Sequence, residues 1–203
     1  MAVTLTKSSP TVSLKKADIS TGVLRVNLNW DQTGGAQKKT GWRSFFDTNT
    51  GIDLDLAALI EMQNGEKGVI QALGNSFGDF DNYPYIKLDK DDRTGSSTDG
   101  ENIMINLAHQ DDFKRICIFT FIYQGAPSWD RAKGVVTLHP ASGQPIQINI
   151  DEYASGKILC GVAMLENDGN GLSIRRIVEY FNGHDELDRR FGWGMQWVAG
   201  SKD

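Results

Sequence analysis

The sequence predicts an all-β fold: a two-sheet antiparallel β-sandwich with about ten strands. Short segments in which every second residue is apolar recur along the chain, as in half-buried strands. Clusters of Gly, Asn, Asp and Ser separate these segments, as turns do. Helical patterns rarely alternate with the strands, so a parallel βαβ sheet is not expected. The chain has 203 residues, a length that one sandwich domain can fill.

The first strands follow from this alternation. Residues 1–11 are polar and we expect them to be loose, so that a single domain spans residues 12–203. Leu, Val, Leu and Trp alternate with polar residues in 23–30 (VLRVNLNW), which predicts a half-buried strand. A second strand is expected over 52–62 (IDLDLAALIEM). The turn sequence NGEKG that follows predicts a hairpin with a return strand.

The later strands complete the two sheets. Residues 84–88 and 101–107 are short strands, and 115–123 (RICIFTFIY) is apolar on both faces, which predicts a central strand. One helical turn is expected after Pro127. Further strands flank the turn residues at 141–143 and the NDGNG sequence at 167–171, the strongest hairpin signal in the chain. The last strand is expected over 191–198, with four apolar side chains on one face: Phe191, Trp193, Met195 and Trp197.

Composition narrows the classes of function. The chain has 21 basic and 26 acidic residues, so it lacks the basic excess of a general nucleic-acid binder. No run of 18 apolar residues is present to insert into a membrane, and the first residues contain no apolar signal segment, so we expect a cytoplasmic protein. Cys117 and Cys160 lie inside apolar runs, which predicts buried thiols rather than metal ligands.

The most unusual stretch is acidic. Seven acids lie between Asp79 and Glu101, and only three basic residues offset them. Two carboxylates 4 Å apart repel each other by roughly 4 kcal/mol at an effective dielectric constant of about 20. A fold that keeps such a loop usually supplies a cation, although an acidic, solvated loop is the alternative.

Calcium suits this stretch best. It takes six to eight oxygen ligands in irregular geometry, and the stretch offers carboxylates, hydroxyls and glycines that bend the backbone. The stretch is not an EF-hand, because the sixth and twelfth positions counted from Asp89 are Thr94 and Gly100. It contains no Cys or His for zinc. The expected ligands are Asp91, Asp92, Asp99 and Glu101, with Asp79, Asp81 and Asp55 reaching the same site from neighbouring segments.

These residues resemble the signature of the TerD-like family of tellurium-resistance and stress proteins. Residues 91–95 (DDRTG) stand where the family has D-N-x-T-G, and 99–101 (DGE) stand near its final acidic pair. The segments VSLKKADISTGVLRVNLNWD, IDLDLAALI and GWGMQWVAG resemble other family segments in the same order, and IFTFIYQGAPSWDRAKGVVTL is most similar to the TerA branch. The acidic segment is one residue shorter than the usual form, and 96–98 (SST) replace acids.

The resemblance implies a function as well as a fold. It implies one or two bound calcium ions, with Thr94 contributing a carbonyl or hydroxyl oxygen. It further implies a non-enzymatic scaffold that acts with other Ter-type proteins, some of them membrane-associated, in resistance to tellurite and other stresses. Two alternatives stay open: a metal-dependent hydrolase that uses the same carboxylates, and a carbohydrate-binding sandwich. Trp42 and Trp129, which lie in expected loops, are the tryptophans best placed to contact a partner.

Overall fold

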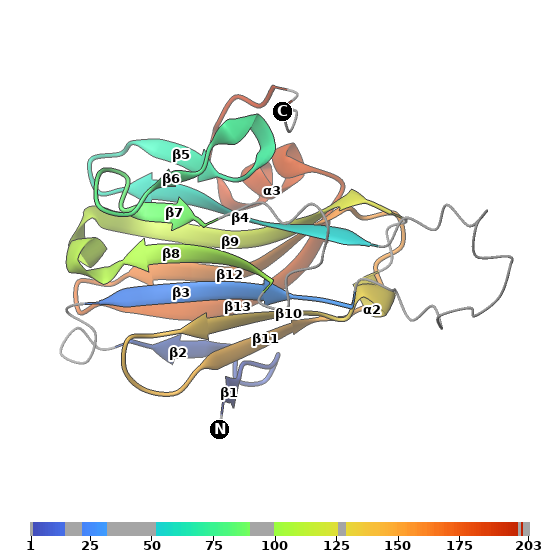
Figure 1. The fold of residues 1–203 in the computed structure, drawn as a ribbon, viewed down its shortest axis with the longest axis horizontal. Coiled ribbons are helices and arrows are strands. Elements are labelled where there is room, and N and C mark those ends of the chain that lie inside the picture. The colour runs from blue at the N-terminus through green and yellow to red at the C-terminus, as the bar shows by residue number, and fades with distance from the viewer. Residues whose placement is uncertain are drawn as a thin grey trace, which may run out of the picture.

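The protein is a two-sheet β-sandwich, as predicted (Figure 1). The computed structural model describes residues 2–14, 22–31, 52–89, 100–125, 129–198 and 200. In these ranges a seven-stranded sheet packs on a six-stranded sheet. The number of strands exceeds the ten or so that the sequence predicts, because strands of two or three residues are too short to show an alternating pattern.

The first sheet contains the strand that follows the acidic stretch. Adjacent strands in this sheet run antiparallel, except β1 and β11. That pair is parallel and so departs from the predicted antiparallel arrangement. In spatial order the strands are β1 (Val3–Thr4), β11 (Ile146–Ile150), β10 (Gly134–His139), β3 (Val23–Asn29), β8 (Glu101–Asn106), β7 (Ile86–Leu88) and β6 (Gly78–Asp79).

The second sheet contains the longest strands. In spatial order they are β2 (Thr11–Ser13), β13 (Leu172–Phe181), β12 (Leu159–Asn167), β9 (Phe113–Gln124), β4 (Asp53–Met62) and β5 (Lys67–Ile70). β9 lies between β12 and β4, which confirms the predicted central strand. The NDGNG turn joins β12 to β13, which confirms the strongest hairpin prediction. The short helical segments are η2 (Leu73–Asn75), η3 (Leu107–Asp112), α2 (Trp129–Ala132) and α3 (His184–Phe191).

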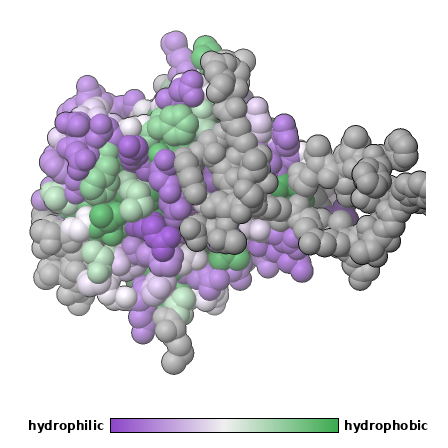
Figure 2. Space-filling view, viewed as in Figure 1, coloured by the Kyte–Doolittle hydropathy of each residue, from purple (hydrophilic) through white to green (hydrophobic). Residues whose placement is uncertain are grey.

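The main core lies between the two sheets. On β3 the side chains of Leu24, Val26 and Leu28 are fully buried, as their alternation predicts. Ile103 and Ile105 on β8 are also fully buried and belong to the same core. Each such side chain contributes roughly 1.5–3 kcal/mol by leaving water. The described residues on the face shown in Figure 2 are mainly hydrophilic, with smaller hydrophobic patches between them.

A second apolar cluster covers the outer face of the six-stranded sheet. It includes Leu59, Phe119, Leu187 and the fully buried Trp193. The expected strand over 191–198 is not present: α3 ends at Phe191, and residues 192–198 pair with no strand. Gly192 and Gly194 have φ values of 64° and 73°, which interrupt an extended ladder. The apolar residues predicted to lie together do pack on the sheet, but from an irregular segment.

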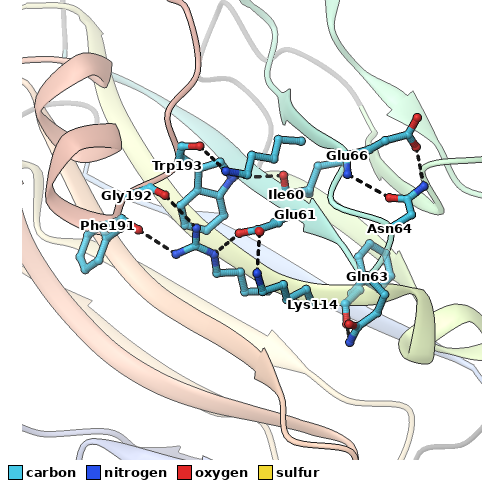
Figure 3. Close-up of polar contacts among 12 residues, drawn as sticks. Ile60, Glu61, Gln63, Asn64, Glu66, Lys114, Phe191, Gly192 and Trp193 are labelled. Carbon is cyan, nitrogen blue, oxygen red and sulfur yellow. Dashed lines mark hydrogen bonds and ion pairs between the residues drawn. The ribbon is translucent and has the colours of Figure 1, made fainter.

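One guanidinium group holds this C-terminal segment in place. Arg115 on β9 donates to the carboxylate of Glu61, and also to the carbonyls of Phe191 at 2.7 Å and Gly192 at 3.2 Å. Figure 3 labels these three acceptor residues. Its guanidinium carbon lies 3.8 Å from the ring centre of Trp193. We call this set of contacts the Arg115 clamp. It joins β4, β9 and the chain after α3.

The Arg115 clamp makes stability depend on pH. Burial alone would raise the pKa of Glu61, but hydrogen bonds and charges from Lys114 and Arg115 outweigh burial and hold that pKa below its ordinary value of 4.5. A carboxyl group whose pKa is lower in the folded state stabilises the fold above its unfolded pKa, and this stabilisation is lost as the pH falls through the folded pKa. We therefore expect the free energy of unfolding, measured in urea, to fall as the pH drops below about 4.5. The fall should be smaller in Glu61→Gln, and equal falls in both proteins would contradict this role.

The N-terminal segment corrects a prediction. Residues 1–11, expected to be loose, supply β1 and the first residue of β2. Val3 and Leu5 donate backbone hydrogen bonds to the carbonyls of Pro145 and Gln147, and the side chain of Leu5 is only 3% exposed. The short VTL sequence is sufficient to form a strand, because it pairs with β11 at the edge of a sheet that the other strands form.

Two further expectations concern single side chains. Trp129 was expected to contact a partner, but its side chain is fully buried and its Nε1 donates to the carbonyl of Lys157 at 2.8 Å. The helical turn predicted near it is present as α2, and Trp42 lies outside the described residues.

Cys117 and Cys160 are free and buried, as predicted, and burial raises the pKa of the Cys117 thiol to about 12. None of the helices in the described ranges is long and apolar enough to cross a membrane.

Candidate metal centre

Glu101, a predicted calcium ligand, reaches the edge of β4 at the residue that follows Asp55, another predicted ligand. Both residues are only 1% exposed. Glu101 begins β8 in one sheet, and its Oε2 accepts a hydrogen bond of 2.6 Å from the backbone N–H of Leu56 in the other sheet. The Glu101 carboxylate therefore crosses between the sheets and binds the residue that follows Asp55.

The edge of β4 is open to such a contact for a topological reason. β5 pairs only with residues 58–61 of β4, so the beginning of β4 extends past its neighbour. On its other side Leu56 is opposite Thr120 of β9. Glu101 thus supplies an acceptor to a backbone N–H that no β5 residue reaches. A buried carboxylate needs opposite charge or hydrogen bonds, since burying a charge costs several kcal/mol without them.

The two ends of the acidic segment lie side by side next to Glu101, because Asp89 before it and Asn102 after it are hydrogen-bonded to each other. The backbone N–H of Asp89 donates to the carbonyl of Asn102 at 2.9 Å. In return Asn102 donates from its backbone and its side chain to the two carboxylate oxygens of Asp89, at 3.3 and 3.2 Å. Four predicted ligands lie outside the described residues: Asp91, Asp92, Thr94 and Asp99.

Polar side chains from β3 fix the start of β8. Asn27 is directly opposite Asn102 in the sheet, and its Nδ2 donates to Asn102 Oδ1 at 3.0 Å. Arg25 Nη1 donates to the same oxygen at 3.1 Å. Asn27 and Asn102 are 8% and 6% exposed. We did not predict this network from the sequence; its only signal is an asparagine in each of two strands, and their facing register is not visible in either strand alone.

Asp79 and Asp81 lie elsewhere, in the hairpin between β6 and β7. Asp79 Oδ1 accepts hydrogen bonds of 2.8 Å from the backbone N–H groups of Asp81 and Asn82, which shapes the turn. Asp79 pairs with Ile86, which pairs with Ile105. Ile105 is four positions along β8 from Glu101, so Asp79 is about 13 Å away along the strands and about 10 Å across them. The structure does not bring these two acids to Asp55 and Glu101.

The described residues alone do not form a complete metal site. Within them, no group of three or more His, Cys, Asp or Glu side chains is arranged to hold an ion. Glu101 is a buried carboxylate at the end of the acidic segment, and Asp55 is a second buried carboxylate, one residue before the Leu56 N–H that Glu101 binds. Hard oxygen ligands of this kind suit Ca²⁺ rather than Zn²⁺.

The fold is shared with two solved structures. A crystal structure of a homologue of the telluride-resistance protein TerD from Streptomyces coelicolor A3(2) matches with a TM-score of 0.56 and 18% identity, over 83% of this chain and 95% of that one. A crystal structure of a protein of unknown function matches with a TM-score of 0.60 and 14% identity, over 87% of this chain and 99% of that one. At these identities the likeness shows the fold alone, which is that of a TerD-type sandwich.

The amino-acid sequence adds a particular relative. The chain is 44% identical over 201 residues to "Tellurium resistance protein TerA" of Alcaligenes sp., which covers 98% of this chain and 58% of TerA. The chain thus spans little more than half the length of that relative. No family model matches. The resemblance to TerD-like tellurium-resistance proteins, on the side of the TerA branch, is confirmed.

Proposed function

We propose that this protein is a calcium-binding module of tellurite and stress resistance that acts as a non-enzymatic scaffold. The likeness to TerA supports the physiological setting. The observation that carries the proposal of calcium is the hydrogen bond from the almost fully buried Glu101 carboxylate to the residue that follows Asp55, which is also almost fully buried. Asp89 and Asn102, at the two ends of the acidic segment, pair beside Glu101. One or two Ca²⁺ ions would be held by these carboxylates together with Asp91, Asp92, Asp99 and an oxygen of Thr94.

A scaffold fits this arrangement better than a metal-dependent hydrolase. Glu101 already uses one carboxylate oxygen on the backbone N–H of Leu56, so it links the two sheets at the site. Calcium bound there would fix the shape of the acidic end, and that surface would contact other Ter-type proteins, including membrane-associated ones, in the cytoplasm. The proposed scaffold neither binds nucleic acid nor inserts into a membrane itself.

Calcium should stabilise the fold through the Asp55–Glu101 edge. A ligand present at 100 times its dissociation constant and bound only to the folded state adds about 2.7 kcal/mol, which corresponds to roughly 5–10 °C in the melting temperature of a domain of this size. We expect this shift when calcium is added to chelator-treated protein. It should be much smaller in Glu101→Gln and in Asp55→Asn.

Asp81→Asn is the matched control for this measurement. It removes one carboxylate from the acidic stretch, but Asp81 is exposed in the distant β6–β7 hairpin. It should keep the calcium-induced shift of the unsubstituted protein. Equal shifts in Glu101→Gln, Asp55→Asn and Asp81→Asn would exclude the proposed position of the ion.

A further inference from the structure

A pocket of about 290 Å³ lies at the end of the sandwich opposite the candidate metal centre. It is formed by the turn after β4, the segment before β7 and the end of η3. Met62, at the end of β4, is seven positions from Asp55, or about 23 Å along the strand. The two sites are therefore independent. The residues that line the pocket are Met62, Gln63, Asn64, Tyr83, Tyr85 and Asp112.

Two tyrosine rings form a rigid corner of this pocket. Tyr83 is 49% exposed, and its ring meets the ring of Tyr85 edge to face, with centres 6.2 Å apart. Tyr85 stacks on His109 at 3.6 Å. The φ of Tyr85 is 62°, an uncommon value for a bulky residue, and backbone hydrogen bonds to Asn82 and Asn106 maintain it. Strain of this kind is found where a structure positions a side chain for a ligand.

The pocket also has one acidic lining residue, Asp112. Asp112 accepts a hydrogen bond of 3.0 Å from Nδ1 of His109, and a carboxylate has acceptor capacity beyond one bond. Tyr83 is hydrogen-bonded to Glu66; burial first, and then this carboxylate, raise the pKa of Tyr83 to about 12, so the ring stays neutral at physiological pH. Glu66 is itself fixed by Asn64, whose Nδ2 donates to it at 2.8 Å and whose Oδ1 accepts from its backbone N–H at 3.0 Å (Figure 3).

We propose that this pocket binds an organic cation: a guanidinium or ammonium group on a flexible stem. The faces of tyrosine rings are electronegative and attract cations within about 6 Å. The carboxylate of Asp112 can accept a charge-assisted hydrogen bond from the same group. The volume is at the lower limit for small-molecule sites, so it suits one side-chain-sized group. A neutral sugar would also contact the rings, but the carboxylate of Asp112, which lines the pocket, favours a cation.

NMR titration of the full chain tests this proposal, with chelator present so that calcium plays no part. Agmatine, which carries a guanidinium and an ammonium group, represents a free small-molecule cation. Arginine capped as an N-acetyl amide represents the side chain of a partner protein, and glucose is the neutral comparator. We expect one or both cations to shift the amide resonances of Asn64 and Tyr85 saturably, while glucose does not. Whichever cation binds more tightly identifies the source of the ligand.

Substitutions at the pocket should weaken this binding. Tyr83→Ala and Asp112→Asn should each raise the dissociation constant about fivefold, the effect of losing one exposed cation–π contact or ion pair. Asp185→Asn, an exposed acid on α3 outside the pocket, should leave it unchanged, and the amide spectrum of each variant reports whether it is folded. The proposal is overturned if neither cation gives saturable shifts, if glucose binds equally well, or if both pocket variants bind like the unsubstituted chain.

Discussion

Replacing Arg115 by methionine should lower the free energy of unfolding by about 3 kcal/mol, because it breaks a largely buried ion pair and leaves the buried carboxylate of Glu61 behind. Methionine keeps an unbranched apolar chain but removes the donors to Glu61, Phe191 and Gly192 and the contact with the Trp193 ring. Glu61 is 5% exposed and would lose its most buried partner. Urea unfolding at neutral pH, followed by tryptophan fluorescence, measures the change.

Arg189→Met is the control for this prediction. Arg189 forms an exposed ion pair with Asp185 at 2.9 Å, one turn apart on α3. Such pairs contribute about 0.5 kcal/mol or less. If the two variants lose similar amounts of stability, the C-terminal segment does not depend on the Arg115 clamp.

Replacing Gly100 by alanine should lower the free energy of unfolding by about 3 kcal/mol. This is the loss typical of backbone strain at a constrained position combined with a shift of the packed strands around it. Gly100 has φ of 63°, and a Cβ atom there would lie 2.0 Å from the carbonyl oxygen of Leu28. The backbones of β3 and β8 would have to separate next to Glu101. Urea unfolding of the calcium-free protein measures this loss.

Gly143→Ala separates the clash from the strain of positive φ. Gly143 has φ of 91°, but a Cβ atom there would contact nothing within 4 Å. Only the conformational cost of about 1 kcal/mol should appear. A loss in Gly100→Ala no greater than in Gly143→Ala would show that β3 and β8 are not packed as closely as described.

The strands were predictable because their signals are local. Alternation marks β3 and β8, and the NDGNG turn marks the β12–β13 hairpin, without reference to the rest of the chain. The helix α3 also had a local signal that we did not use: Asp185 and Glu186 in its first turn, basic residues in its last turn, and Gly192 after it. Apolar alternation after Phe191 favoured a strand, but positive φ at two glycines prevents one.

The candidate site was only partly predictable, since it depends on which strands meet. Asp55 and Glu101 lie far apart in the sequence, and the hydrogen bond from Glu101 to Leu56, the residue after Asp55, follows from the extension of β4 past β5. Asp79 counts as an acid near the others in the sequence, but its carboxylate is used on backbone N–H groups of its own turn. A count of charges cannot separate these two roles.

Isothermal titration of calcium into chelator-treated protein tests the central claim most directly. We predict saturable binding of one or two ions, retained in Asp81→Asn and weakened at least about tenfold in Glu101→Gln, the loss typical when a group that supports a metal site is removed. Absence of saturable heat in the unsubstituted protein, or binding that Glu101→Gln leaves unchanged, would contradict a calcium site at the Asp55–Glu101 edge.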